Sequence, residues 1–249
     1  MKVVVLAITY CCSDVARFFL RHYETIADEI AIFDDFSTDG TREIFQAHPK
    51  VLLRDWPHPG SGINEDLFLN FLYSVYPTAA KHGFDWFIVA DPDEFLYAPN
   101  PRGVLEQALK DGVEVIQTKG FNLVGDGLPN DDGRQIYEVN PMGVPAPVYS
   151  KPVIIRPTAK VRWVRGRHAL ENCSPRLSNG PLFKLLHYRY LGAAYTAAKN
   201  AKNYARCGLD SGDKGAAWSC SPGYNGADKE HSPLWAEEAK KKAVNVLEL

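Results

Sequence analysis

The sequence lacks the charge imbalance and the long apolar stretches that mark nucleic-acid-binding and membrane proteins. Its 249 residues carry 28 Lys and Arg against 30 Asp and Glu, which gives a net charge of -2 and a pI near 6.4. No surplus of positive charge offers a broad surface to nucleic acid. The apolar run Val3–Ile8 is far shorter than the roughly 20 residues that span a bilayer, and no small-residue cleavage site follows it. We therefore expect no nucleic-acid partner, no transmembrane segment and no signal peptide.

Cysteine is also scarce. The five cysteines are an odd number without C-x-x-C spacing, which argues against a disulfide framework and against a zinc ribbon. This pattern predicts reduced thiols and a cytoplasmic location. The sequence does have apolar side chains in quantity, 45% hydrophobic and 12% aromatic residues, enough for a substantial globular core.

Strand and helix patterns alternate in the first part of the chain. The apolar runs Val3–Ile8, Glu29–Phe33 and Val51–Arg54 predict buried strands, and Ser13–Ala27 and Thr41–Ala47 carry helical spacing between them. Ser13 is expected to cap the first of these helices, and Asp39 the second. Alternation at this spacing predicts right-handed βαβ units, and hence a parallel sheet.

The rest of the chain is expected to continue this domain. Residues 1–206 are predicted to form one domain, with halves 1–98 and 99–206, and 207–249 a flexible tail with a terminal helix. Gly, Pro, Asn and Asp in Gly120–Pro147 predict a mobile substrate loop. The remaining predicted helices are Asn64–His82, Gly103–Lys110 and Ala193–Arg206, and the remaining predicted strands are Trp86–Ala90, Val113–Lys119, Pro152–Arg156, Lys160–Val164 and Leu182–Tyr188.

Two predicted strands end on carboxylates. Glu29–Phe33 leads into Asp34 and Asp35, and Trp86–Ala90 leads into Asp91 and Asp93. Asp34 and Asp35 point to opposite sides of the chain, so one of the two is expected to cap local backbone instead. Strands of one parallel sheet deliver these side chains to the same edge, where open α/β sheets bind ligands. Oxygen ligands of this kind suit Mg²⁺ or Mn²⁺ chelated by a diphosphate, although an Asp-x-Asp unit alone is more often a solvated turn.

Several segments in this order resemble the family 2 glycosyltransferases, and in detail a branch near family 92 whose members carry D-x-D-E-F. The segments are DDFSTDGT, WFIVADPDEFL, SKPVIIRP, the Gly166-Arg167-His168 tripeptide and LLHYRY, and the match extends to about Arg206. The resemblance implies an α/β fold of GT-A type: a mostly parallel Rossmann-like sheet, helices on both faces and a small antiparallel extension. It also implies transfer of a sugar from a nucleoside diphosphate sugar, first of all a UDP-sugar, to a hydroxyl of a glycan or other acceptor.

The same resemblance implies roles for individual residues and a Mn²⁺ or Mg²⁺ cofactor. Lys151, Arg165 and Arg167 are cations near these segments, which a leaving diphosphate needs. For His187 a buried structural histidine is the alternative to a metal ligand. The implied substrate-binding residues are Thr9, Asp35, Asp91, Lys151 and His168, and the implied metal ligands are Asp91, Asp93 and His187.

The catalytic base is less well marked by the sequence. Family members typically invert the anomeric carbon, which requires a carboxylate to take the proton of the attacking hydroxyl. The candidates are Asp126, Glu171 and Glu94, the last of which could instead brace its neighbours. A nucleotidyltransferase is the rival enzyme class, but no Gly-rich phosphate loop follows the first strand. A non-catalytic nucleotide-sugar-binding module is the other alternative.

Overall fold

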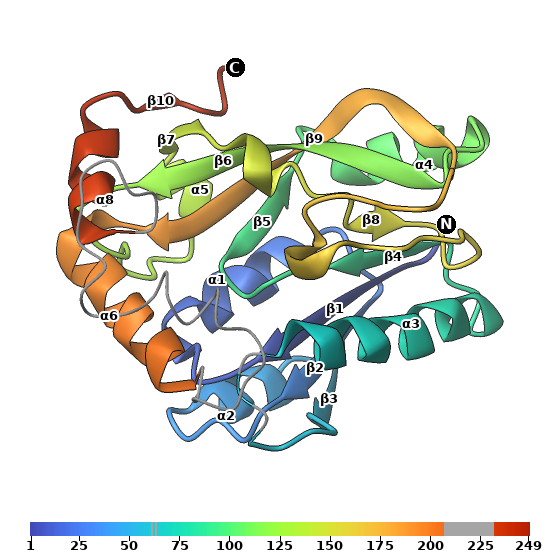
Figure 1. Cartoon of the computed structure of the whole chain (residues 1–249), viewed down its shortest axis with the longest axis horizontal. Helices are drawn as coiled ribbons and strands as arrows, with labels where there is room; N and C mark the ends of the chain where they lie inside the picture. Colours follow the sequence, from blue (N-terminus) through green and yellow to red (C-terminus); the bar gives the residue numbers. More distant parts are fainter. Residues whose placement is uncertain (61, 63, 207–231) are drawn as a thin grey trace.

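A computed structural model describes residues 1–60, 62, 64–206 and 232–249. One sheet of ten strands runs through these residues, in the order β10-β7-β6-β8-β4-β1-β2-β3, with β5 and β9 joined to it beside β6 (Figure 1). The predicted α/β class is confirmed: a parallel set of strands, helices on both faces and an antiparallel extension.

The first half of the chain builds the parallel part of the sheet. It consists of β1 (Val3–Thr9), β2 (Glu29–Asp34), β3 (Val51–Asp55) and β4 (Trp86–Val89). β1 lies between β2 and β4, and all three pairings in the order β4-β1-β2-β3 are parallel. The carboxyl ends of these strands therefore share one edge, as the sequence predicted.

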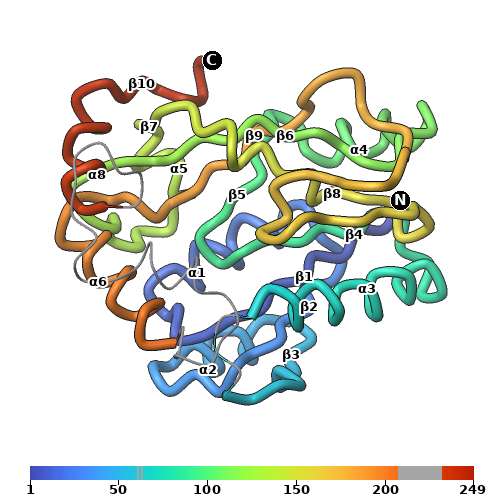
Figure 2. The backbone as a smooth tube through the Cα atoms, in the orientation of Figure 1, coloured from blue at the N-terminus to red at the C-terminus, as the bar shows by residue number. Residues whose placement is uncertain are grey.

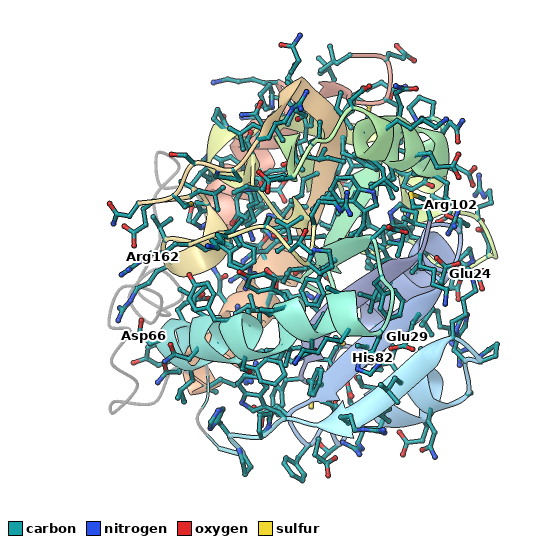
Figure 3. The ribbon with its side chains drawn as sticks, turned by 90° about the vertical axis from the view of Figure 1, so that its right-hand side faces the viewer. Glu24, Glu29, Asp66, His82, Arg102 and Arg162 are labelled. Carbon is teal, nitrogen blue, oxygen red and sulfur yellow. The ribbon has the colours of Figure 1, made fainter. Side chains whose placement is uncertain are left out.

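The right-handed connections between the parallel strands place the first helices on both faces of the sheet. α1 (Ser13–Tyr23) and α2 (Thr41–Gln46) follow connections that step from β1 outward to β3. α3 (Glu65–Lys81) leads back across the sheet to β4, so right-handed crossovers place it on the opposite face (Figures 1 and 3). No helix in the described ranges combines the length and apolarity needed to cross a bilayer.

Two buried hydrogen bonds fix helices to the backbone on either side of the acidic turn Asp91–Glu94. The indole N–H of Trp86 donates to the carbonyl of Leu105 in α4 (Pro101–Lys110) at 3.1 Å. The hydroxyl of Tyr23 in α1 donates to the carbonyl of Glu94 at 2.8 Å, and both aromatic side chains are fully buried. α1 and α4 thus hold the backbone on each side of the Asp91–Glu94 turn.

The second half of the chain extends the sheet with mostly antiparallel pairings. β9 pairs parallel with β6 and antiparallel with β5, so it joins the acidic turn to the extension. The strands are β5 (Glu94–Tyr97), β6 (Val115–Val124), β7 (Met142–Pro145), β8 (Ile154–Ile155), β9 (Leu177–Tyr190) and β10 (Val244–Asn245).

Some predictions for this half and for the caps were wrong. The predicted loop Gly120–Pro147 contains the end of β6, a short helix α5 (Ile136–Val139) and β7. Lys160–Val164 forms no strand, only an isolated bridge between Trp163 and Leu170. Ser13 does not cap α1, because its hydroxyl donates to Asp39 at 2.9 Å. The predicted flexible tail falls largely on residues 207–231, which lie outside the described residues.

Two helices near the end of the chain pack on each other and on the sheet. α6 (Gly192–Arg206) contacts α8 (Pro233–Lys240), and β10 then pairs with β7. Figure 2 shows α6 running from the extension down to the carboxyl end of β1. This path places a helix from the last part of the domain across the acidic edge.

Gly120 lets β6 pass closely under the turn that precedes Lys151. Its N–H donates to the Ser150 hydroxyl at 3.0 Å, and its carbonyl accepts from the Ala146 N–H at 2.9 Å. A Cβ at this position would lie 2.5 Å from the Ala146 oxygen and 2.7 Å from the Ser150 nitrogen, both backbone atoms that cannot rotate away.

We therefore expect Gly120→Ala to lower the free energy of unfolding by about 1–3 kcal/mol, the usual cost of overpacking. Urea denaturation measures the change, with Glu106→Ala as control because Glu106 is exposed on α4. Equal stability of the two variants would show that the backbone of this turn can move aside without loss of stability.

Candidate functional site

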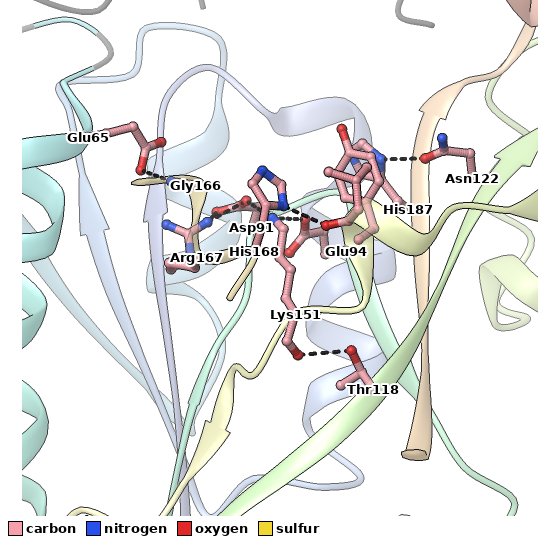
Figure 4. Close-up of polar contacts among 12 residues, drawn as sticks. Glu65, Asp91, Glu94, Thr118, Asn122, Lys151, Gly166, Arg167, His168 and His187 are labelled. Carbon is pink, nitrogen blue, oxygen red and sulfur yellow. Dashed lines mark hydrogen bonds and ion pairs between the residues drawn. The ribbon is translucent and has the colours of Figure 1, made fainter. Parts of the chain in front are cut away.

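A cavity of about 450 Å³ opens at the carboxyl ends of the parallel strands. We call it the cleft. The acidic turn lines it together with residues of α3 and α6 and with Gly166, Arg167 and His168. Figure 4 shows Asp91 and Glu94 of this turn close to Lys151 and Arg167. The polar residues that line the cleft are Tyr10, Asn64, Glu65, Asp91, Asp93, Glu94, Tyr149, Lys151, Arg167, His168, His187, Arg189, Lys199, Lys202, Asn203 and Arg206.

Asp91 contacts two cations in the cleft. Nη2 of Arg167 donates to both of its carboxylate oxygens, at 2.8 and 2.7 Å, and Nζ of Lys151 lies 3.3 Å from Oδ2. Burial raises the pKa of Asp91, but the two positive charges outweigh burial and hold the pKa well below its usual value. Asp91 is therefore an anion at neutral pH, and its charge is already balanced within the protein.

Lys151 also binds Glu94, one of the three candidate bases. Nζ of Lys151 lies 2.5 Å from Oε1 of Glu94, and both side chains are almost fully buried. Burial raises the pKa of Glu94 to about 7 in spite of the lysine. Glu94 lines the cleft, but its carboxylate is bonded to Lys151 rather than open to an acceptor, which suits the bracing role considered for it.

Asp93 faces α6. Nζ of Lys199 lies 3.6 Å from its Oδ2, and the two side chains are 13% and 15% exposed. Burial raises the pKa of Asp93, but Lys199, His187 and Arg189 together outweigh burial, so the pKa is lowered. Each carboxylate of the Asp91-Pro92-Asp93-Glu94 turn thus has a cation of the protein as its neighbour.

His187 lies beside this turn on β9, where it pairs with Glu94 in the strand register. Its Nδ1 lies 3.0 Å from the Asn122 side-chain oxygen, an acceptor, so Nδ1 carries the proton and Nε2 keeps a lone pair. The ring stacks on Tyr149 with centroids 4.1 Å apart, and burial lowers the pKa of His187 to about 3. The histidine is neutral and fixed in one orientation.

The segment with Arg167 and His168 has an unusual backbone. Gly166 and Arg167 both have positive φ, 73° and 60°, a conformation that only glycine adopts without strain. The Gly166 N–H donates to Oε2 of Glu65 at 3.1 Å, and the Arg167 guanidinium stacks on Phe68 at 4.2 Å. Among described residues, Nε and Nη1 of Arg167 have no hydrogen-bond partner. Backbone strain and unsatisfied donors together mark this arginine as a functional candidate.

His168 follows directly. Its Nδ1 donates to the carbonyl of Val148 at 2.6 Å, and the ring lines the cleft, consistent in position with the predicted substrate contact. Burial, and then Lys151, lower the pKa of His168.

The end of β2 separates its two carboxylates. Asp34 is fully buried and accepts from the Thr9 hydroxyl at 2.9 Å and from the Ser37 N–H at 2.8 Å. It caps local structure, as one of the pair was expected to do. Asp35 instead receives a hydrogen bond from Nη2 of Arg206 at 2.7 Å. Thr9, a predicted substrate contact, is 1% exposed and does not line the cleft.

Arg206 connects the end of α6 with this strand edge. Its guanidinium lies 4.2 Å from the centroid of the Tyr10 ring while it binds Asp35. Tyr10 and Arg206 line the cleft, and Asp35 lies behind them. A planar group that donates to Asp35 and lies on Tyr10 has the properties expected of a bound nucleobase.

Three predicted residues lie away from the cleft. Asp126 is 92% exposed and pairs with Lys240 beside a second, smaller cavity of about 370 Å³. Glu171 pairs with Arg162 on the outer surface, where Figure 3 labels Arg162. Arg165 is half exposed and pairs with Asp66.

The surroundings of the three predicted metal ligands decide whether they can bind a divalent ion. Asp91, Asp93 and His187 all line the cleft, but Arg167 occupies both oxygens of Asp91 and Lys199 lies against Asp93. Within the described part of the chain, no three His, Cys, Asp or Glu side chains come together as a metal site. As arranged, this donor set does not fit a divalent ion, because its charges are already taken by protein cations.

Five further residues line the cleft but were not predicted from the sequence: Glu65, Tyr149, Lys199, Lys202 and Arg206. The α6 cations were visible in the sequence at spacings of three and four, one face of a helix. Such a stripe is usually solvated, and nothing in the sequence alone showed that it faces the acidic turn.

No family model and no curated protein matches the chain. Among solved structures it is similar to TarS of S. aureus, with 12% identity, a TM-score of 0.44, and coverage of 81% of this chain and 39% of that one. Structures of TarS 1-349 with UDP and with UDP-GlcNAc are 14% and 13% identical, with TM-scores of 0.42 and 0.43. These cover 85% of this chain and 68% of the other. A TM-score below 0.5 is a loose likeness, and the chain spans well under half of the longer TarS.

The buried pair of Lys151 and Glu94 yields a test of the site's charge balance. We expect Lys151→Met to lower the free energy of unfolding by about 3–5 kcal/mol, because it leaves buried carboxylates without their cation. In a Glu94→Gln background the same substitution should cost markedly less, since one of those charges is gone. Urea denaturation of the four proteins of this cycle measures the coupling, and an equal cost in both backgrounds would contradict the pairing.

Proposed function

We propose that the protein is a glycosyltransferase of GT-A type that moves a sugar from a nucleoside diphosphate sugar to an acceptor hydroxyl, with inversion. The observation that carries the proposal is the cleft at the strand ends, where cations of α6 lie beside Asp93 and Asp35 and where Tyr10 offers an aromatic face. The motif order supports the same class and the branch near family 92.

The donor has a natural place along this edge. Its base would take the position of the Arg206 guanidinium, on Tyr10 and against Asp35. Asp91 would face the ribose, and the diphosphate would meet the cations that surround the acidic turn, among them Lys151 and Arg167. His168 lies on the same wall, where its Nε2 can accept a hydrogen bond from a sugar hydroxyl while Nδ1 donates to the Val148 carbonyl. UDP is the nucleotide to test first.

The transfer itself needs a proton acceptor and a stabilised leaving group. The acceptor oxygen attacks the anomeric carbon as the bond from that carbon to the phosphate oxygen breaks, and the electron pair leaves with the nucleoside diphosphate. Glu65 is the cleft carboxylate best suited to take the hydroxyl proton. It binds only the Gly166 N–H, and it has no ion pair within the described ranges, unlike Asp91, Asp93 and Glu94.

Mn²⁺ or Mg²⁺ remains a prediction from the resemblance, and no step above passes through a metal. A non-catalytic binding module would bind nucleotide equally well, so turnover is the measurement that separates it from a transferase.

Incubation with a panel of nucleoside diphosphate sugars, UDP-sugars first, should release free nucleoside diphosphate by transfer to an added sugar alcohol or to water. Chromatography of the nucleotide products checks this. A panel without any turnover, in the presence of confirmed UDP binding, would favour the binding module. Release of nucleoside monophosphate and pyrophosphate exchange would indicate the nucleotidyltransferase class instead.

The role of Glu65 is tested by its amide variant. Glu65→Gln should lower turnover by about 100-fold or more while UDP binding is retained, because general base catalysis contributes on that scale. Asp66→Asn is the matched control, since Asp66 is the next residue of α3, is 59% exposed and pairs with Arg165 outside the cleft. Unchanged turnover in Glu65→Gln would remove Glu65 from the reaction.

A further inference from the structure

One face of α6 presents a line of cations to the acidic edge of the sheet. Lys199, Lys202 and Arg206 follow one another at spacings of three and four residues, so they share a helix face. All three line the cleft. The face reaches from Asp93 at one end to Asp35 at the other, since Lys199 pairs with the first and Arg206 with the second.

Lys199 stands where a divalent ion would be expected. Its ammonium group is the nearest positive charge to Asp93, at 3.6 Å, and the ion pair is mostly shielded from solvent. Burial lowers the pKa of Lys199, but interactions with Asp93, Tyr195 and Asp14 outweigh it, so the pKa is raised. Lys199 is therefore a fixed positive charge at neutral pH.

Lys202, one turn further along, is differently placed. It lines the cleft and is partly exposed, and it has no ion pair with any carboxylate in the part of the chain that the structure describes. Its ammonium group can bind an anion without breaking an ion pair to any residue that the structure describes.

The cleft as a whole carries a positive surplus. Among the described residues, six Lys and Arg side chains line it against four Asp and Glu. Arg206 is paired with Asp35 outside the lining, which leaves one positive charge in excess. A diphosphate entering this cleft meets attraction, although the three carboxylates of the acidic turn line it, because each of the three already has a cation neighbour. Charges fixed in a shielded cleft act more strongly than the same charges in water.

We propose that Lys199 and Lys202 bind the diphosphate of the donor directly and that this binding does not require a divalent ion. The inference rests on the proposed function for the identity of the donor, but its ligand group is the diphosphate alone. On bond cleavage the same two ammonium groups would stabilise the charge that develops on the leaving phosphate.

Titration calorimetry with inorganic pyrophosphate, and in parallel with UDP, tests the proposal on the full chain in excess EDTA and again with Mn²⁺. We expect pyrophosphate to bind in EDTA. Lys202→Met should weaken that binding about tenfold, the loss of one charge-assisted contact. Lys199→Met should weaken it at least as much. Lys202 forms no ion pair with residues 1–60, 62, 64–206 or 232–249, so its variant stays informative if Lys199→Met melts at a lower temperature.

Lys241→Met is the matched control, because Lys241 is 68% exposed, pairs with Glu238 of α8 and does not line the cleft. It should bind pyrophosphate as the unaltered protein does. No binding in EDTA with clear binding in Mn²⁺ would overturn the proposal and support the predicted metal. Equal weakening by all three variants would overturn it too, as a general effect of net charge.

The two hypotheses fail separately. Pyrophosphate binding in EDTA without turnover of any nucleotide sugar would leave this inference standing and sink the proposed function. Sugar transfer that occurs only with Mn²⁺, together with no pyrophosphate binding in EDTA, would do the reverse.

Discussion

The ion pairs around the Asp91–Glu94 turn are the constraint on which the site depends. A buried strand ends on three carboxylates, and each has a cation from another segment beside it: Arg167 or Lys151 for Asp91, Lys199 for Asp93, and Lys151 for Glu94. Holding such charges out of water costs several kcal/mol per ion unless a partner is in place. The segments that carry Lys151, Arg167 and Lys199 must therefore pack against the parallel half of the sheet, and in doing so they form the walls of the cleft.

The parallel half could be predicted because its information is local. Val3–Thr9 and Trp86–Val89 are continuous apolar runs, and a carboxylate that follows such a run has to lie at the strand end. The same reasoning separated Asp34 from Asp35, since neighbouring residues of an extended chain point to opposite sides. The pairing of Lys199 with Asp93 could not be predicted in this way, because it joins residues more than a hundred positions apart and depends on where α6 packs.

Composition misled the prediction for Gly120–Pro147. Gly and Asn usually mark loops, but here they are residues of a buried strand that meet special demands. Residue 120 is a glycine because the backbone of the turn between Ala146 and Ser150 lies too close for a Cβ. Asn122 is fully buried in β6, and its side-chain oxygen orients His187 at the cleft. Residues that look like breaks in a strand can thus be the positions where that strand touches a site.

Helix α6 joins the two ends of the cleft. Lys199 and Arg206 are seven residues apart, about two turns or 10 Å of helix, and they hold Asp93 and Asp35 respectively. A nucleoside diphosphate has the same polarity, with a planar group at one end and phosphates at the other. Its phosphates would bind Lys199, and its base would displace Arg206 from Asp35. Each half of the ligand would thus replace one contact that α6 makes in the free protein. The contacts that are lost and those that are gained all involve a charged group. The new contacts therefore offset part of the free energy needed to break the two buried ion pairs of α6.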